Sequence, residues 1–279
     1  MLNEVNKMKK FQEIRDVIAS PDNKFYKLLK KLDQKKYRDE NHIFKAEGEK
    51  FLTEDINFNK IIVKESKYEY YQEKYYIDDF NNVTILKDNL FDEISDQENT
   101  QGVIVLYSSN LKNLNEITDD VVILDNIQDP GNVGTIIRTL EATGFKNLIL
   151  TKGSVDVYNP KTVRATMGGI FKVNIIYDTP ENILSFLKES NYQIISTALH
   201  EDAINYDEIE IKDNKNAYIF GNEGNGVTDF FINNSHIKSI IPIYGEIESL
   251  NVGIATAVFL YKMREKQEKR NVKKEKNYV

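Results

Sequence analysis

The stretch that most constrains the fold runs from Val121 to Leu150, where a strand, a glycine-rich turn, a helix and a second strand follow one another. Val121–Leu124 is an unbroken apolar run of the kind found in strands that are buried on both faces of a parallel sheet. Leu148–Leu150 resumes a strand after Gly144, which stands where a left-handed helix cap belongs. Between them, apolar residues recur at helical spacing, at Val133, Ile136, Ile137 and Leu140. The stretch therefore predicts a β-α-β unit of an α/β domain.

Arg138 lies on the polar side of this expected helix. At about 100° per residue, it stands roughly 150° from the centre of the apolar stripe. It cannot serve the core, so we expect it to point toward the sheet's edge or solvent.

Two later stretches combine a strand with a loop of glycines and polar residues. Tyr218–Val227, YIFGNEGNGV, is an apolar strand that ends in a loop with one carboxylate. Ile241–Tyr261 reads as a short strand, a polar loop and a strongly apolar helix. Open α/β sheets bind their ligands just past the carboxyl ends of strands, so these loops are candidate parts of one site.

Together the three stretches closely resemble the signature motifs of the SpoU (TrmH) family of RNA ribose 2′-O-methyltransferases, of the SPOUT class. The resemblance covers about residues 120–264, and the N-terminal third more loosely. Gly253 departs from the pattern, because many relatives carry serine there. The matching positions are Asn132, Gly134 and Arg138 in the first motif, Gly221, Glu223, Gly224 and Gly226 in the second, and Ile241, Pro242, Gly245, Glu248, Ser249, Leu250 and Asn251 in the third.

The resemblance implies an α/β fold in which a C-terminal trefoil-knot domain with a parallel sheet follows a small L30e-like α/β domain. It implies S-adenosyl-L-methionine as cofactor and a homodimer formed through the apolar helix Val252–Tyr261. The implied catalytic residues are Asn132, Arg138, Glu223, Ser249 and Asn251. The implied cofactor-binding residues are Thr197, Leu199, Phe220, Gly221, Asn222, Gly226, Ile241, Pro242, Ile243, Ser249 and Leu250.

By resemblance Arg138 acts on the ribose 2′-hydroxyl, and it is often described as the general base. Arginine essentially never loses its proton in a protein. We therefore favour a role in which it fixes the adjacent phosphate and stabilises the developing alkoxide, with Glu223 paired to Arg138 or to Asn132.

The expected division of the chain is an RNA substrate-binding domain over 1–107, a linker over 108–119, the methyltransferase domain over 120–264 and a charged, frayed tail over 265–279. Short β-branched runs predict the first sheet, at 61–63, 83–86 and 103–106. A strand at Ile43–Phe44, a turn at Glu47–Gly48 and a following helix are similar to the opening of the L30e-type domain.

A basic amphipathic helix is expected from Ser20–Pro21–Asp22 onward, with Ser20 as the cap. Residues 24–38 hold seven basic residues against the single acid Asp33. Such a run is either a solvated helix face or an RNA-docking surface. The candidate RNA contacts are Lys27, Lys30, Lys31, Arg138, Lys161 and Arg164.

Composition excludes several classes of function. The net charge of −7 argues against indiscriminate nucleic-acid coating, because phosphate binding needs clustered positive charge. The absence of cysteine excludes disulfides, thiolate metal sites and a cysteine nucleophile, and three scattered histidines make a metal centre improbable. No run is long enough for a membrane span, and the start lacks a secretory signal's apolar core, so we expect a cytoplasmic protein.

The alternatives concern both the motifs and the substrate. The glycine order of GNEGNG is wrong for a dinucleotide loop, and three ordinary turns would not explain Glu223 and Ser249 beside Asn132. Tyrosines over 65–80 suit a half-buried helix better than a base-stacking platform. Ribosomal RNA is the favoured substrate, because the N-terminal domain looks like that of the family members that modify rRNA. A transfer-RNA methyltransferase, or a non-catalytic RNA-binding or ribosome-assembly protein on the same fold, is the alternative.

Overall fold

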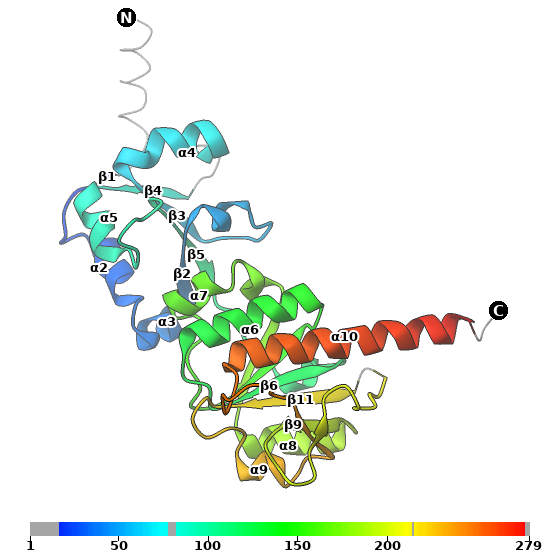
Figure 1. Ribbon diagram of the computed structural model, residues 1–279. Helices are drawn as coiled ribbons and strands as arrows, with labels where there is room; N and C mark the ends of the chain where they lie inside the picture. The colour runs from blue at the N-terminus through cyan, green and yellow to red at the C-terminus, as the bar shows by residue number, and fades with distance from the viewer. Residues whose placement is uncertain (1–16, 78–81, 214, 277–279) are drawn as a thin grey trace, which may run out of the picture. The chain divides into compact units, whose positions relative to one another are not determined.

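The computed structural model describes residues 17–77, 82–213 and 215–276, and it divides into two compact units (Figure 1). The first comprises residues up to Ser109 together with Tyr158–Arg164, and the second Asn110–Val157 with the residues from Ala165 onward. The start of the chain, on which the expectation about a secretory signal falls, lies outside the described residues. No helix within the described ranges has the length and apolarity needed to cross a membrane.

The first unit is built on a mixed five-stranded sheet with the strand order β1-β4-β3-β5-β2. Strand β5 is antiparallel to both of its neighbours, whereas β1, β4 and β3 run parallel. The elements are β1 (Val17–Ile18), α2 (Lys24–Lys31), α3 (Lys35–Asn41), β2 (Ile43–Glu47), the 3-10 turns η1 (Glu49–Thr53) and η2 (Glu65–Lys67), β3 (Lys60–Lys64), α4 (Tyr68–Tyr75), β4 (Val83–Leu86), α5 (Asp88–Ile94), β5 (Val103–Ser108) and, in the Tyr158–Arg164 segment, most of α7 (Pro160–Ala165).

The expected start of the basic helix is wrong by three residues. Helix α2 is capped by Asn23, whose Oδ1 accepts from the N–H groups of Phe25 (2.8 Å) and Tyr26 (3.2 Å). Ser20 instead accepts from the N–H of Asp22 in the turn that precedes the helix. Asparagine caps a helix as well as serine does, so Asn23 takes the position that was expected for Ser20.

The single basic helix expected over 24–38 is also wrong, because the chain breaks it into α2 and α3. Arg38 is buried and donates through Nη1 to the carbonyls of Leu32 and Asp33, both at 2.7 Å. These carbonyls lie at the end of α2, so a cation read as part of a polar surface closes the helix break.

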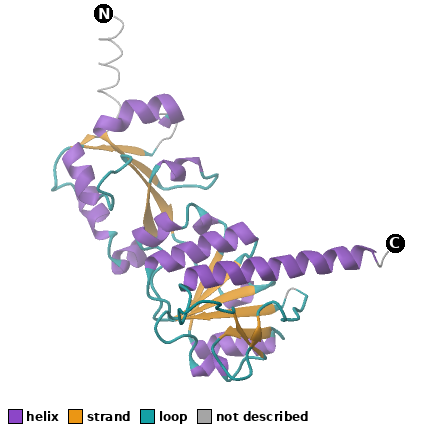
Figure 2. Ribbon diagram, in the orientation of Figure 1, coloured by secondary structure: helices purple, strands orange, loops and turns teal. Residues whose placement is uncertain are grey.

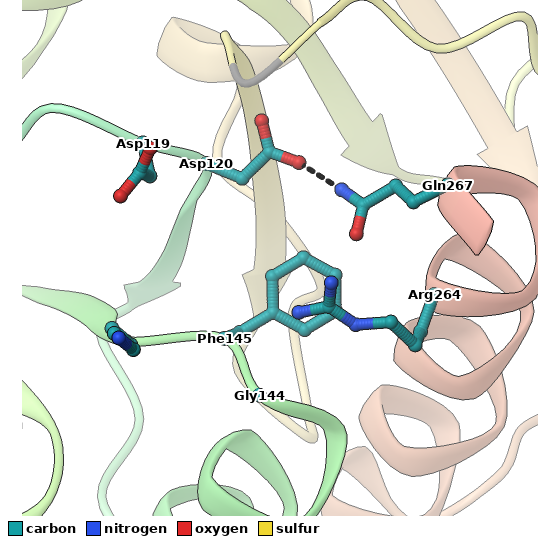
Figure 3. A pocket seen from close by; sticks show the side chains of 7 residues that line it. Asp119, Asp120, Gly144, Phe145, Arg264 and Gln267 are labelled. Atoms are coloured by element: carbon teal, nitrogen blue, oxygen red, sulfur yellow. Dashed lines mark hydrogen bonds between the residues drawn. The ribbon is translucent and has the colours of Figure 1, made fainter. Parts of the chain in front are cut away.

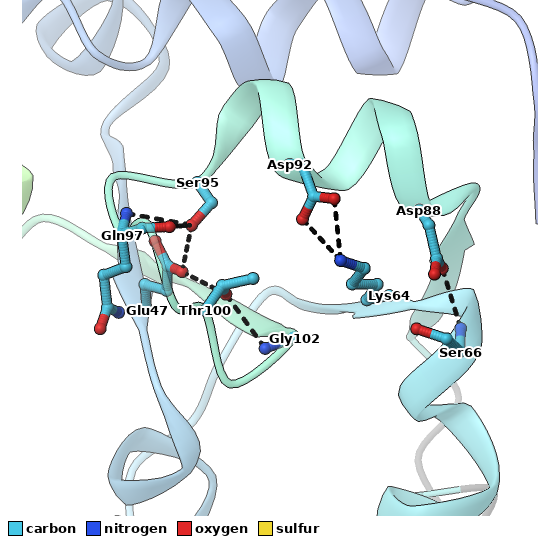
Figure 4. A network of polar contacts seen from close by, with 9 residues as sticks. All are labelled: Glu47, Lys64, Ser66, Asp88, Asp92, Ser95, Gln97, Thr100 and Gly102. Carbon is cyan, nitrogen blue, oxygen red and sulfur yellow. Dashed lines mark hydrogen bonds and ion pairs between the residues drawn. The ribbon is translucent and has the colours of Figure 1, made fainter.

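A buried carboxylate organises the edge of this unit (Figure 4). Glu47 accepts from the hydroxyls of Ser95 and Thr100, each at 2.6 Å, and from the N–H of Asp96 at 3.0 Å. The expected turn at Glu47–Gly48 is present. The 3-10 helix η1 follows it, with Gly48 as its N-cap. The carboxylate fixes the loop between α5 and β5 against β2.

The second unit is built on a seven-stranded parallel sheet, with the strand order β10-β12-β9-β11-β6-β7-β8. Its elements are η4 (Leu114–Glu116), β6 (Val121–Asp125), α6 (Pro130–Thr143), β7 (Asn147–Thr151), η5 (Gly169–Phe171), β8 (Asn174–Asp178), α8 (Pro180–Glu189), β9 (Gln193–Thr197), β10 (Ile204–Asn205), β11 (Asn216–Gly221), α9 (Asp229–Ile232), β12 (Ile237–Ile240) and α10 (Val252–Lys276). The predicted parallel α/β architecture is confirmed, and the trefoil knot stays a prediction.

Helices cover both faces of this sheet (Figure 2). Val121 and Ile123 share a core cluster with α8 and α9, whereas Tyr218 and Phe220 stack edge-on against Phe259 of α10. Because side chains alternate along a strand, the unbroken apolar run in β6 supplies both layers.

Helix α10 corrects the expectation of a frayed tail, because it continues to Lys276 and packs along α6 (Figure 1). Gln267 Nε2 donates to the buried carboxylate of Asp120, and Arg264 Nε donates to the carbonyl of Thr143 at 2.6 Å. Asp120, Arg264 and Gln267 line a pocket of about 160 Å³, in which the guanidinium of Arg264 lies over the ring of Phe145 (Figure 3). Polar side chains thus fasten the second half of α10 to the amino-terminal edge of the sheet.

Substitution Gln267→Ala should lower the free energy of unfolding by about 1–3 kcal/mol, because it leaves a buried carboxylate short of one donor. Burial raises the pKa of Asp120, which marks the cost of charging that group. Urea unfolding measures the change. The matched control is Glu268→Ala, one residue along, because the exposed pair of Glu268 with Arg264 at 4.0 Å should contribute little. Equal losses in the two variants would contradict the view that the contact between Gln267 and Asp120 anchors α10.

Candidate functional site

The sheet order brings the ends of distant strands together at its carboxyl edge. Strand β9 lies between β11 and β12, and Ser239 is in register with Thr197. On the other side of β11, Gly221 is in register with Asp125 at the end of β6. The loops that follow β6, β9, β11 and β12 therefore begin at one edge, as the sequence predicts.

Asn251 is the residue from which helix α10 begins. Its Oδ1 accepts from the N–H groups of Gly253 (2.9 Å) and Ile254 (3.3 Å), so it caps the helix N-terminus. With its oxygen committed to the cap, its Nδ2 is left to donate, and it does so to Asn132 Oδ1 at 3.0 Å.

Asn132 lies in the first turn of α6, where Asp129 caps the helix and accepts from the Asn132 N–H at 2.8 Å. Because Asn132 Oδ1 accepts from Asn251, its Nδ2 must be directed elsewhere, and it donates to Glu223 Oε1 at 2.5 Å. The three side chains form a relay with one donor direction, from Asn251 through Asn132 to Glu223. Two helix N-termini flank it, and their dipoles favour the carboxylate.

The loop that carries Glu223 is closed on itself. Asn222 and Gly226 exchange backbone hydrogen bonds at 3.0 and 2.8 Å. A Cβ on Gly221 would lie 1.9 Å from the carbonyl carbon of Gly226, so only glycine permits this closure. Gly221 therefore serves the loop's own fold rather than only the approach of a ligand.

Arg138 is exposed, as predicted, but the structure does not join it to the relay. No hydrogen bond or ion pair involves its side chain in the described ranges. It follows Asn132 by six residues, about 9 Å along the helix and about 120° around it. Glu223 pairs with Asn132 rather than Arg138, and Ser249 is exposed in the loop before α10.

The cofactor-binding candidates fall into two groups. Phe220 is buried against Phe259, and Thr197 Oγ1 donates to the carbonyl of Ile219 at 3.0 Å, so both side chains serve the fold. The others surround the loops at the edge. Leu199 is exposed, Gly221 and Asn222 are half-buried, Gly226 is exposed, and Ile241, Pro242, Ile243 and Leu250 are half-buried.

The short strand expected at the start of Ile241–Tyr261 is wrong, because β12 ends at Ile240 and Ile241–Ile243 is loop. Proline has no N–H for a sheet ladder, which accounts for the early end. The apolar side chains of this segment are thereby released from the sheet to line the edge.

These surroundings fit an adenosine-bearing ligand. The position where Gly226 would carry a Cβ meets open space, and apolar Ile241 and Ile243 follow β12, which ends at the same edge of the sheet. The buried hydroxyl of Ser239, in register with Thr197, has no hydrogen-bond partner within the described part of the chain. Buried hydroxyls ordinarily have a partner in the protein, in ordered water or in a bound ion, so this hydroxyl has an open acceptor and donor at the edge of the site.

Two residues at the end of β6 support the site and were missed at the level of sequence. Asp125 is buried, and its Oδ2 accepts from the N–H of Thr228 at 2.8 Å. The backbone carbonyl of Asn126 accepts from Asn222 Nδ2 at 3.0 Å. The signal for them in the sequence is a pair of polar residues directly after the apolar run Val121–Leu124.

The basic candidates of the first unit are mostly paired. Lys27 binds Asp22 at 2.8 Å, and Lys30 binds Glu93 at 3.0 Å. Lys31 lies 5.1 Å above the ring centre of Tyr37. Exposed pairs of this kind are weak, so they leave the cations available to phosphate.

The two candidates on α7 differ in exposure. Lys161 is exposed, whereas Arg164 is half-buried. Burial raises the pKa of Asp96, and the positive charge of Arg164 acts to lower it. Arg164 is thus partly engaged within the first unit.

Substitution Asn251→Ala should lower the free energy of unfolding by about 0.5–2 kcal/mol, because it removes the cap of α10. Asn251→Asp keeps a capping oxygen and should cost much less, although it removes the donor to Asn132. Thermal unfolding of both variants measures this difference. Equal losses would show that the amide donor, not the cap, holds α10 in place.

Comparison with known proteins identifies both units. The SpoU rRNA Methylase family matches residues 119–261, and the MRM3-like substrate binding domain matches residues 23–105. The 23S rRNA (guanosine(2553)-2′-O)-methyltransferase RlmP of Bacillus subtilis is 30% identical over 88% of this chain and 98% of its own. The tRNA (guanosine(18)-2′-O)-methyltransferase of Aquifex aeolicus is 28% identical over 58% of this chain and 79% of its own.

A solved structure agrees with the fold of both units. The AdoMet-bound rRNA methyltransferase from Sinorhizobium meliloti superposes with a TM-score of 0.79 at 28% identity. The match covers 90% of this chain and 97% of that one. The similarity therefore extends beyond the edge of one sheet to nearly the whole chain.

Proposed function

Since the chain belongs to the SpoU rRNA methylase family, we propose that it transfers a methyl group from S-adenosylmethionine to a ribose 2′-hydroxyl of ribosomal RNA, of the 23S type. The observation that carries the proposal is the Asn251–Asn132–Glu223 relay at the carboxyl edge of the parallel sheet. The relay unites residues from all three motifs. Three unrelated turns would have no reason to share one line of hydrogen bonds.

S-adenosylmethionine supplies, when bound, a methyl group on a positively charged sulfur that departs as a neutral thioether. The loops Gly221–Thr228 and Ile241–Leu250 would hold it at the edge. The C–O bond would form as the C–S bond breaks, and the 2′-hydroxyl proton would leave to a phosphate oxygen or to water. The protein's task is to orient the hydroxyl and to stabilise its developing charge.

Arg138 performs the electrostatic part of this task. Its guanidinium keeps its proton, binds the phosphate next to the target ribose and stabilises the alkoxide. Asn132 and Glu223 orient the ribose. Ser249 is exposed in the loop that joins Ile241–Ile243 to Asn251. The assignment of these roles follows the family motifs and the exposure of Arg138.

The functional form in this proposal is a homodimer in the cytoplasm. Ile254, Val258 and Tyr261 form an exposed apolar stripe at helical spacing on α10. Within the described part of one chain Arg138 makes no hydrogen bond or ion pair with Glu223, and in this proposal a second copy brings a guanidinium to the relay.

Substitution Arg138→Ala should abolish methyl transfer while leaving the affinity for S-adenosylmethionine nearly unchanged. Tritium transfer to RNA measures the first quantity, and calorimetric titration measures the second. Lys188→Ala, which removes a cation from α8, should retain activity. A collapse of cofactor affinity in Arg138→Ala would refute the assigned role.

Neutralising Lys27, Lys30 and Lys31 together should weaken RNA binding and flatten its dependence on salt, by about 0.7–0.9 in logarithmic slope for each phosphate that these cations neutralise. Binding of an rRNA fragment across a salt series measures this. A triple variant of equal charge in the second unit, at Lys112, Lys172 and Lys188, is the control. An unchanged slope would show that α2 is only solvated.

Transfer RNA is the second candidate substrate, favoured by the match to the Aquifex aeolicus enzyme. Mapping 2′-O-methyl groups in RNA from cells with and without the gene separates the candidates. A methyl group missing from 23S rRNA supports the proposal, and one missing only from tRNA supports the alternative. If no methyl group disappears and no cofactor binds, the protein is a non-catalytic RNA-binding or ribosome-assembly protein.

A further inference from the structure

Asn126 holds an unusual backbone conformation at the end of β6. Its φ is +58°, in the left-handed region that residues other than glycine seldom adopt, although asparagine tolerates it better than most. It is exposed between the buried residues Asp125 and Ile127. A conformation of this kind persists only where the surroundings determine it.

The turn after β7 supplies those surroundings. The N–H of Asn126 donates to the buried Thr151 Oγ1 at 2.8 Å. Gln128 Nε2 donates to Asn126 Oδ1 at 2.9 Å and to the carbonyl of Gly153 at 2.7 Å. The N–H of Val155 donates to the carbonyl of Ile127 at 2.9 Å. The short segment that follows β6 is thus tied to residues 151–155 from Asn126, Ile127 and Gln128 alike.

The carbonyl of Asn126 in turn anchors the loop that carries Glu223. It accepts from Asn222 Nδ2 at 3.0 Å, while Asn222 Oδ1 accepts from the N–H of Gly224 at 2.9 Å. The side chain of Asn222 therefore links the end of β6 to Gly224. Asn222 and Gly224 are the residues on either side of Glu223. The loop is closed by its own backbone hydrogen bonds. The contact between Asn222 and Asn126 is therefore not needed for the loop to form, and it sets the position of the closed loop relative to α6.

We propose that Asn126 is a positioning residue for the methyl transfer, whose left-handed backbone sets Glu223 against Asn132 by way of Asn222. This role rests on the proposed function, because that function has Glu223 help to orient the ribose in the transition state of methyl transfer. In this role Asn126 acts through Asn222 and Glu223 rather than on the reacting atoms. Gln128 contributes by holding the amide of Asn126.

The test compares Asn126→Ala with Asn126→Gly. Glycine adopts a φ of +58° without strain and keeps the carbonyl in place, whereas alanine is strained there. A misplacement of catalytic groups by about 1 Å costs about 100-fold in rate, so Asn126→Ala should lower kcat by about 10- to 100-fold. Asn126→Gly should restore most of it. The KM for rRNA and the affinity for S-adenosylmethionine should stay near those of the wild type in both variants.

A second measurement distinguishes positioning from general damage. If Asn126 acts through Glu223, Asn126→Ala should change kcat little when it is added to Glu223→Gln. Gln128→Leu, a substitution of an exposed side chain, should lower kcat in the same direction by a smaller factor, and it serves if Asn126→Ala does not fold.

Three results would overturn the proposal: an unchanged kcat with a lowered melting temperature in Asn126→Ala, equal loss in the alanine and glycine variants, or full additivity with Glu223→Gln. Wild-type protein assayed in parallel separates the two levels of inference. If it binds S-adenosylmethionine but methylates no RNA, the proposed function fails and this role fails with it.

Discussion

The carboxamide of Asn132 is the interaction on which the site depends. An amide has one donating and one accepting end, and both are engaged, by Glu223 and Asn251 respectively. The cap of α10 fixes the orientation of Asn251, which fixes that of Asn132. A helix start thereby determines which way a side chain faces on another helix. This is why asparagine, rather than aspartate or leucine, suits both positions.

The parallel sheet makes this convergence possible. Asn132, Glu223 and Asn251 are far apart in sequence, but each follows a strand whose carboxyl end lies at the same edge. The opposite edge has the complementary role, since Asp120, Arg264 and Gln267 fasten α10 there. The same helix is thus held at its start by the site and farther along by a buried carboxylate. The relay and the anchor at Asp120 thus share one helix, and Asn251 belongs to both the relay and the cap that stabilises that helix.

Sequence patterns predicted what local periodicity determines. The strand–turn–helix unit around Asn132, the parallel sheet and the exposure of Arg138 followed from spacing alone, and the motifs indicated the family. Sequence could not decide between Ser20 and Asn23 as a helix cap, because both are good caps. It misread 265–276 as frayed, because the partners of Gln267 and Arg264 lie more than a hundred residues away. The roles assigned to Arg138 and Ser249 stay predictions.

Helices α6 and α10 pack closely at Gly253, which lies against the side chain of Thr135 on α6. A Cβ on Gly253 would lie 3.2 Å from Asn251 Oδ1 and 3.3 Å from Thr135 Cγ2, closer than side chains ordinarily pack. A serine at position 253 would therefore require the capping side chain of Asn251 and the side chain of Thr135 to move by a few tenths of an ångström. The glycine lets the start of α10 lie against the first half of α6 without that shift.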